Sequence, residues 1–137
     1  MNTELSSKER VLKCFRGEKI DRLPVFSGYG NVTVHGLDKY GWRFAEIHVD
    51  AKKMASMAAS TNQLFGLECA VVPFDMGVEA EALGAGVNFY AHHTDVVYPT
   101  ISSKVSEKVA DLDLTLPSDL ANAGRIPLVV EAIRRLK

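Results

Sequence analysis

The sequence predicts an α/β fold that contains about half of a (β/α)8 barrel. Three short apolar stretches typical of buried strands, residues 23–26, 68–72 and 86–90, are separated or followed by stretches with helical periodicity. A closed eight-stranded barrel needs roughly 250 residues, whereas this chain has 137. No repeat, linker or low-complexity tract divides the sequence. We therefore expect a single unit over residues 1–137, an incomplete barrel.

The first helix is expected at residues 7–16. Ser6 and Glu9 have the spacing of a capping box, in which each side chain accepts the backbone N–H of the other residue. Gly17 then provides the left-handed residue that commonly ends a helix. The apolar stripe of this helix consists of Val11, Leu12 and Phe15.

The clearest helix begins after Asp50, a good N-cap residue, and ends at Gly66. Between them, side chains recur at the three- and four-residue intervals of one helix face. Two methionines lie in this stripe, and they indicate core packing rather than a soft-metal site. The stripe consists of Met54, Met57, Ala58, Thr61, Leu64 and Phe65.

Two further helical regions are expected. A short helix or two should form around His35, where no clean period is visible. The last helix should start near Ile126, because Pro127 is tolerated in a first helical turn and apolar residues follow at helical spacing.

Asp75 is the candidate ligand-binding residue. An apolar run over residues 69–72 ends in a proline, and Asp75 follows, with Glu79 and Glu81 on an expected short helix that Gly84 closes. Residues just past the carboxyl ends of strands line the ligand crevice in α/β sheets and barrels. The alternative is that Asp75 only caps the following helix by accepting its free N–H groups. The spacing leaves both interpretations open.

No metal site is predicted from the cysteines and histidines. Cys14 and Cys69 stand in apolar contexts without a Cys-x-x-Cys motif, which favours reduced thiols over a disulfide or a metal site. His92 and His93 are adjacent, so in an extended segment they point to opposite faces and are poorly placed to chelate one ion. We expect them to be solvated loop residues.

The charge balance argues against polyanionic partners. Sixteen basic and seventeen acidic residues give a net charge of −1, without a basic stripe, so neither nucleic acid nor an anionic membrane is an expected partner. No apolar run approaches the ~20 residues that span a bilayer, and the first residues lack a signal-peptide core. We expect a cytoplasmic protein.

The expected half-barrel also predicts association. Its outer strands would have unpaired edges, and its apolar faces would lack covering helices. We therefore expect the chain to associate with itself, most simply as a homodimer, or with a separate chain that completes the barrel.

Several segments together resemble the amino-terminal part of the uroporphyrinogen decarboxylase superfamily. Residues 9–26, which begin Glu-Arg-Val-Leu-Lys-Cys-Phe-Arg-Gly-Glu, are similar to the opening helix and first strand of that family. Residues 72–84, which begin Val-Pro-Phe-Asp-Met, are similar to its second strand and acidic turn, and residues 112–133 are similar to the stretch before its next strand. The resemblance implies the N-terminal half of a TIM-barrel-like fold. It also places Asp75 at the position of an essential aspartate of the decarboxylases.

Within the superfamily, the corrinoid-dependent methyltransferases are the more similar branch. The decarboxylases carry an Arg-Gln-Ala-Gly-Arg motif after the first strand, and its arginines hold substrate carboxylates; this chain has Ser-Gly-Tyr-Gly-Asn at residues 27–31. Bidentate binding by a guanidinium is not easily replaced. Residues 26–33, 44–54 and 73–76 instead resemble the methylcobamide:coenzyme M methyltransferases of methanogens.

For full-length members of that branch, the resemblance implies a zinc ion and a corrinoid protein. Zinc, bound by a His-x-Cys pair and a later cysteine, holds coenzyme M as a thiolate, and the thiolate takes the methyl group from methylcob(III)alamin. This sequence contains no His-x-Cys pair. We therefore expect no cofactor in this chain itself.

The leading hypothesis is an amino-terminal fragment, or a short relative, of a corrinoid protein:coenzyme M methyltransferase that is inactive alone. A competing hypothesis is a non-catalytic binding or assembly module that completes a barrel with another chain. A weaker alternative is a decarboxylase-like enzyme centred on Asp75.

Overall fold

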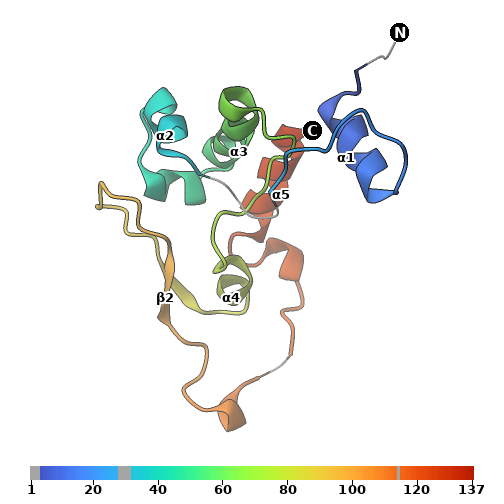
Figure 1. The fold of residues 1–137 in the computed structure, drawn as a ribbon. Coiled ribbons are helices and arrows are strands. Elements are labelled where there is room, and N and C mark those ends of the chain that lie inside the picture. Colours follow the sequence, from blue (N-terminus) through green and yellow to red (C-terminus); the bar gives the residue numbers. More distant parts are fainter. Residues whose placement is uncertain (1–3, 28–31, 114) are drawn as a thin grey trace.

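Helices dominate the part of the chain that the structure describes, which is residues 4–27, 32–113 and 115–137 of a computed structural model (Figure 1). None of the described helices is long and apolar enough to cross a bilayer. In chain order the elements are α1 (Ser7–Phe15), α2 (Val34–Tyr40), the 3-10 helix η1 (Phe44–His48), α3 (Ala51–Phe65), α4 (Val78–Ala82), β1 (Gly86–Asn88), β2 (Thr100–Ser103), the 3-10 helices η2 (Val109–Asp111) and η3 (Leu120–Asn122), and α5 (Ile126–Leu136).

The capping residues expected from the sequence form the helix ends. Ser6 and Glu9 make the capping box of α1: the N–H of Glu9 donates to the Ser6 hydroxyl, and the N–H of Ser6 donates to the Glu9 carboxylate over 3.0 Å. At α3, the Asp50 side chain accepts the N–H of Lys53 over 2.9 Å, and Gly66 ends the helix in the left-handed region at φ 71°. Local sequence therefore determines where these two helices begin and end.

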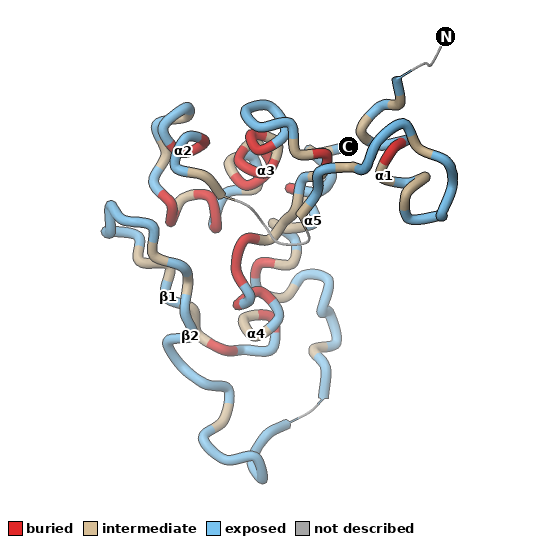
Figure 2. The backbone as a smooth tube through the Cα atoms, in the orientation of Figure 1, coloured by how far each residue is buried: buried red, intermediate tan, exposed pale blue. Residues whose placement is uncertain are grey.

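The core lies where α3 packs between its neighbours. The stripe predicted for α3 is buried at Met54, Met57 and Ala58, against α5, η1 and α2. Figure 2 shows the buried residues concentrated in α3 and in the segment that leads into α4. The buried cluster consists of Leu37, Phe44, Ile47, Met54, Ala55, Met57, Ala58, Phe74 and Ala132.

Two of the three expected strands are absent: residues 23–26 and 68–72 do not form strands. The two segments lie beside each other, since the N–H of Glu68 donates to the Val25 carbonyl over 2.7 Å. In a pair of strands, the N–H of Val25 would donate to a backbone carbonyl of the other segment. Here it donates to the Glu68 side-chain carboxylate over 2.9 Å. Pro24 and Pro73 have no N–H to continue a ladder. The expectation of buried side chains was also wrong at the first segment, where Val25 is 58% exposed.

The third expected strand forms but is shorter than residues 86–90. β1 pairs antiparallel with β2, with Val87 opposite Ile101 and a register irregularity after Gly86. It ends at Asn88, whose side chain accepts the N–H of Tyr90 over 2.9 Å in a turn that puts Tyr90 at φ 51°. The strand is thus ended by an asparagine turn, which its apolar alternation does not reveal.

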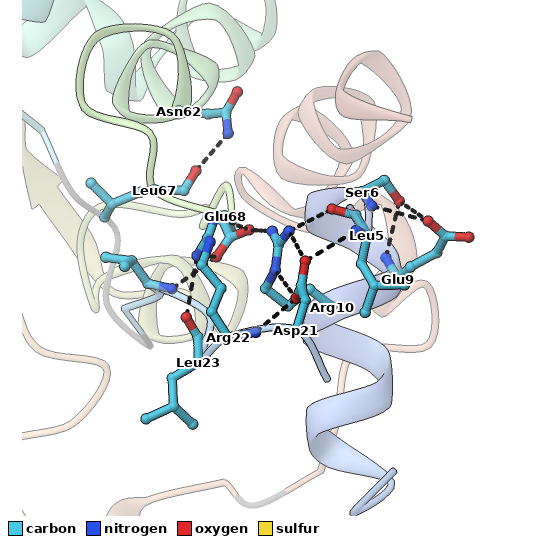
Figure 3. Close-up of polar contacts among 11 residues, drawn as sticks. Leu5, Ser6, Glu9, Arg10, Asp21, Arg22, Leu23, Asn62, Leu67 and Glu68 are labelled. Atoms are coloured by element: carbon cyan, nitrogen blue, oxygen red, sulfur yellow. Dashed lines mark hydrogen bonds and ion pairs between the residues drawn. The ribbon is translucent and has the colours of Figure 1, made fainter. Parts of the chain in front are cut away.

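A cluster of charged side chains joins α1 to the two segments that were expected to be strands (Figure 3). The buried Arg10 donates through Nε and Nη2 to both oxygens of Asp21, over 2.7 and 2.8 Å, and through Nη1 to Glu68. Arg22 donates to the same Glu68 carboxylate over 2.9 and 3.2 Å. We call Arg10, Asp21, Arg22 and Glu68 the amino-terminal ion cluster.

The amino-terminal ion cluster keeps its carboxylates ionised. Hydrogen bonds from Arg10 hold the pKa of Asp21 well below its usual range. Burial raises the pKa of Glu68, but the bonds from the Val25 N–H and from the two arginines outweigh burial, and the pKa falls below its usual value. The contacts of Arg10 therefore depend on charge as well as on packing.

Replacing Arg10 tests whether the amino-terminal ion cluster holds this region together. Arg10→Met keeps a long stem but, among the described residues, leaves the buried Glu68 with only the half-exposed Arg22 as an ionic partner, so we expect the melting temperature to fall by roughly 10 °C. Arg16→Met is the matched control, because Arg16 is exposed and lies 3.8 Å from Glu18; it should shift the melting temperature by less than about 2 °C. Similar shifts in the two variants, measured by thermal unfolding, would contradict this role.

Candidate functional site

Asp75 lies in the turn between residue 72 and α4, where its side chain is 2% exposed. Four donors surround its carboxylate. Oδ1 accepts the N–H of Gly77 and Nη2 of Arg125, both over 2.9 Å. Oδ2 accepts Nη1 of Arg125 over 3.0 Å and lies 2.9 Å from Nδ1 of His48. The residue singled out by the sequence is thus the centre of a buried polar network.

Arg125, which directly precedes α5, binds Asp75 in the bidentate geometry that suits a guanidinium and a carboxylate. Its Nε donates to Glu81 of α4 over 2.5 Å, and its Nη1 also lies 3.3 Å from the backbone carbonyl of His48. The guanidinium lies 4.6 Å from the ring centroid of Phe89. One side chain therefore connects the start of α5 to η1, to α4 and to the Asp75 turn.

Two glycines allow this close approach. A Cβ on Gly77 would lie 3.0 Å from Oδ1 of Asp75, tighter than about nine in ten real Cβ contacts. Gly124 has φ +51°, and a Cβ there would lie 2.9 Å from the backbone nitrogen of Ala82 in α4. Gly124 thus lets the chain pass against α4 and present Arg125 to Glu81 and Asp75.

His48 is the last residue of η1 and is fully buried. Its ring packs edge-on against Phe44, at 4.9 Å between centroids, and against Phe74, at 6.0 Å. Because Nδ1 faces Asp75, the histidine adds a third side chain to the pair that Asp75 and Arg125 form. We call Asp75, His48, Arg125 and Glu81 the Asp75 network.

The Asp75 network favours charged forms of both central residues. Burial raises the pKa of Asp75, but hydrogen bonds from His48, Arg125 and the Gly77 N–H outweigh it and hold the pKa well below its usual range. Burial lowers the pKa of Arg125, yet the bonds to Asp75 and Glu81 raise it overall. At neutral pH the pair is therefore a buried carboxylate and a buried guanidinium.

The geometry around Asp75 bears on both interpretations of this residue, helix capping and ligand binding. The capping interpretation is met only in part, since Asp75 accepts the N–H of Gly77, the residue that precedes α4, and α4 has no side-chain cap. An ionised carboxylate has about four lone-pair sites, and four protein donors already use them. Direct ligand contact by Asp75 stays a prediction, and such a contact would have to displace or share one of these donors.

An open cleft of about 880 Å³ borders Asp75. It is lined by residues 71–77 and Glu79, and by Tyr98, Pro99 and Ile101 beside β2. Most of these side chains are apolar, and the lining residues include no lysine, arginine or histidine. The cleft therefore suits an apolar surface or ligand better than an anion.

The remaining candidate residues are dispersed. Cys14 and Cys69 are free and half-buried, and His92 and His93 are exposed, as expected for loop residues. Within residues 4–27, 32–113 and 115–137, no three His, Cys, Asp or Glu side chains are grouped so that they could hold a metal ion. The segment 27–31, which distinguishes the two branches of the resembling superfamily, lies outside the described residues from Gly28 to Asn31.

His48 and Arg125 were not identified as site residues from the sequence. Each carried a weak signal: a histidine directly after Phe-Ala-Glu-Ile, and an arginine between a glycine and the apolar start of a helix. A polar residue inside an apolar context is expected to have a buried partner. The sequence does not say which partner, because Arg125 and Asp75 are 50 residues apart.

Comparison with known proteins gives a consistent result along the whole chain. Residues 6–137 match the family model described as uroporphyrinogen decarboxylase (URO-D). The methylcobamide:CoM methyltransferase MtbA of Methanosarcina acetivorans is 32% identical over 134 residues, which are 98% of this chain and 38% of that protein. The methylcobamide:CoM methyltransferase MtaA of Methanosarcina barkeri is 31% identical over 96% of this chain and 38% of its own length.

A solved structure agrees with these relatives. A methyltransferase from Methanosarcina mazei superimposes with a TM-score of 0.83 at 30% identity, over 97% of this chain and 38% of that protein. The chain thus spans well under half the length of the relatives it matches. The predicted fold, the amino-terminal part of a uroporphyrinogen decarboxylase-like α/β barrel, is confirmed.

Removing the charge of Asp75 tests the energetic role of the Asp75 network. Asp75→Asn keeps the size of the side chain but leaves the buried Arg125 with Glu81 as its one carboxylate partner among the described residues, so we expect a loss of about 3 kcal/mol of unfolding free energy at neutral pH. The exposed Asp38 offers a control, since Asp38→Asn should change stability by less than about 0.5 kcal/mol.

The stability difference between the wild type and Asp75→Asn should also depend on pH. Because the folded-state pKa of Asp75 is lowered, its contribution is complete above the unfolded value of about 3.9 and is lost as the pH falls through the folded value. Urea unfolding should therefore show a constant difference between wild type and Asp75→Asn from pH 7 to about pH 5, which shrinks below about pH 4. A difference that grows on acidification would refute the assignment.

Proposed function

The chain belongs to the uroporphyrinogen decarboxylase family, and from this premise we propose that it supplies the amino-terminal part of a corrinoid protein:coenzyme M methyltransferase barrel. The observation that carries the proposal is the match of almost the whole chain to 38% of methylcobamide:CoM methyltransferases, without a large gap in coverage. The activity named for those relatives is methyl transfer from a methylcobamide to coenzyme M. By this proposal the chain is inactive alone and acts with the rest of the barrel, and a corrinoid protein is its methyl donor.

The residues of this chain do not fit the zinc ion that the family resemblance implies. The sequence contains no His-x-Cys pair, and the described residues contain no group of three or more metal-ligating side chains. Three or more such ligands are needed for a tight zinc site. No step of the proposed function therefore uses a metal held by this chain.

In this proposal, the chain itself contributes the surface of the cleft next to the site of methyl transfer. The Asp75 network fixes the turn that borders the cleft, because Arg125 holds it to η1, α4 and α5. Asp75 stands where the family resemblance places an essential aspartate. In this proposal Asp75 and Arg125 keep that part of the barrel mouth in one geometry, and the remainder of the barrel supplies the methyl-transfer chemistry.

A decarboxylase activity is the less favoured alternative. The arginine-containing motif that holds substrate carboxylates in the decarboxylases is replaced by Ser-Gly-Tyr-Gly-Asn at residues 27–31. The cleft beside Asp75 has no cationic side chain among its lining residues. Polycarboxylate substrates would find no guanidinium there to bind them.

A second candidate function, a non-catalytic assembly module, is favoured by the apolar side chains that the described structure leaves exposed. Leu23 is 77% exposed and Met76 is 95% exposed, although Leu23 begins one expected barrel strand and Met76 follows another. Exposed apolar patches of this kind commonly mark contact surfaces. Their partner under this alternative is another chain that completes the barrel, or a second copy in a homodimer.

Complementation distinguishes these functions. The chain is mixed with the separately produced carboxyl-terminal remainder of the Methanosarcina acetivorans relative, and methyl transfer from methylcobalamin to coenzyme M is measured. We expect no transfer by the chain alone, and transfer by the mixture well above that of the remainder alone. Sedimentation of the same samples reports whether the two pieces form a 1:1 complex.

The outcomes separate the candidates. A 1:1 complex without transfer would favour the assembly module over the methyltransferase. Absence of any complex, with the chain as a monomer at tens of micromolar, would contradict both. Transfer by the chain alone would overturn the proposal that it is inactive without the rest of the barrel.

A further inference from the structure

The outward side of α1 combines apolar and basic side chains. The buried Arg10 marks the side of α1 that faces the rest of the chain. On another side, Lys8, Leu12 and Phe15 follow one another at helical spacing, and all three are exposed. Leu12 is 40% exposed and Phe15 is 68% exposed, and the exposed Arg16 comes directly after them. Exposed apolar side chains gathered on one face commonly mark a contact surface.

An open groove of about 440 Å³ borders this side of α1. Its charged lining residues are Lys8 and Glu68. Glu68 is already bound by Arg10 and Arg22, so its charge is compensated. The remaining charge in the lining is the exposed ammonium of Lys8. We call this the α1 groove, and it suits an apolar segment that carries negative charge.

A segment of that kind lies between β2 and residue 114. Residues 105–113, which we call the acidic arm, contain three acidic residues and one lysine. All of them except Ser106 are exposed, and Figure 2 shows the arm as an exposed excursion from the body of the molecule. Val109, the first residue of η2, is 91% exposed, and Leu112 is 40% exposed. The acidic arm thus offers the apolar side chains and the charge that the α1 groove suits.

The acidic arm and α1 lie at opposite ends of the molecule (Figure 1). The arm is therefore far from the groove of its own chain. Two copies in antiparallel orientation around a two-fold axis would bring each arm beside the α1 groove of the other copy. Such a pair makes the same contact twice and closes on itself, as most homodimers do.

We propose that the α1 groove binds the acidic arm of a second copy of this chain, in an antiparallel homodimer. Val109 and Leu112 enter the apolar part of the groove, and the carboxylates of the arm lie beside Lys8 and Arg16. The apolar centre supplies most of the affinity, and the opposite charges select the partner segment. This inference deepens the assembly-module candidate by naming its contact, and it does not rest on methyl transfer.

Charge reversal on either surface tests the contact. The arm variant is Glu107→Lys with Asp111→Lys, and the groove variant is Lys8→Glu with Arg16→Glu. All four side chains are exposed, so each variant should keep the circular dichroism spectrum of the wild type. Sedimentation over a concentration series measures the dimer dissociation constant. We expect it to rise roughly tenfold or more in each variant, because both contacts of the dimer become repulsive.

An equimolar mixture of the two variants should dimerise about as tightly as the wild type. In the mixed dimer a basic arm meets an acidic groove, and the unchanged acidic arm meets the unchanged basic groove. The matched control is Asp38→Lys with Asp95→Lys, which makes the same charge change as the arm variant at exposed positions outside both surfaces. It should keep the dissociation constant of the wild type. Added salt should weaken the wild-type dimer, which gives a readout that needs no variant.

Four results would overturn the inference. A wild-type chain that stays monomeric would do so, and if it still gave methyl transfer with the barrel remainder, only the proposed function would stand. Equal affinity of the wild type and both variants would place the dimer contact elsewhere. A mixture that dimerises no better than its components would exclude the pairing of arm and groove. Binding of the barrel remainder that the groove variant abolishes, without a dimer of the chain, would assign the groove to the remainder.

Discussion

The bidentate pair between Asp75 and Arg125 is the interaction on which this half of the molecule depends. It joins residues 50 positions apart, and Arg125 reaches two further segments through Glu81 and the carbonyl of His48. Burying two charges is costly, and the cost is offset only when geometry and additional hydrogen bonds are good. All four lone-pair sites of Asp75 are used, so this pair meets that condition.

The amino-terminal ion cluster, near the start of the chain, is also built from buried charges that are paired and hydrogen-bonded. There Arg10 and Arg22 meet around Glu68, beside two segments that were each expected to be a strand. A carboxylate takes the N–H of Val25 that a strand ladder would otherwise use. In both places, guanidinium–carboxylate contacts connect segments that are far apart in the sequence: two extended segments at Glu68, and the Asp75 turn with α4 and the start of α5 at Arg125. The structural likeness to the methyltransferase therefore lies in the path of the chain, although residues 23–26 and 68–72 form no strands.

The sequence predicted the features that depend on local rules. The capping box of Ser6 and Glu9, the N-cap at Asp50 and the glycine ends of α1 and α3 follow from residues within a few positions of one another. The strands at residues 23–26 and 68–72 were wrong because pairing depends on neighbours that local pattern does not supply. Asp75 was found because it follows an apolar run, whereas His48 and Arg125 were missed because only the fold brings them to it. Whether Asp75 contacts a ligand stays a prediction.

The central claim is that Asp75 and Arg125 stabilise the fold as a pair. A double-mutant cycle with Asp75→Asn and Arg125→Gln, measured by urea unfolding at pH 7, tests it directly. We expect a coupling energy above about 2 kcal/mol, because either single change leaves a buried partner with part of its charge uncompensated, whereas the double change removes both charges. Effects that add to within about 0.5 kcal/mol would show two independent contributions and would contradict the account.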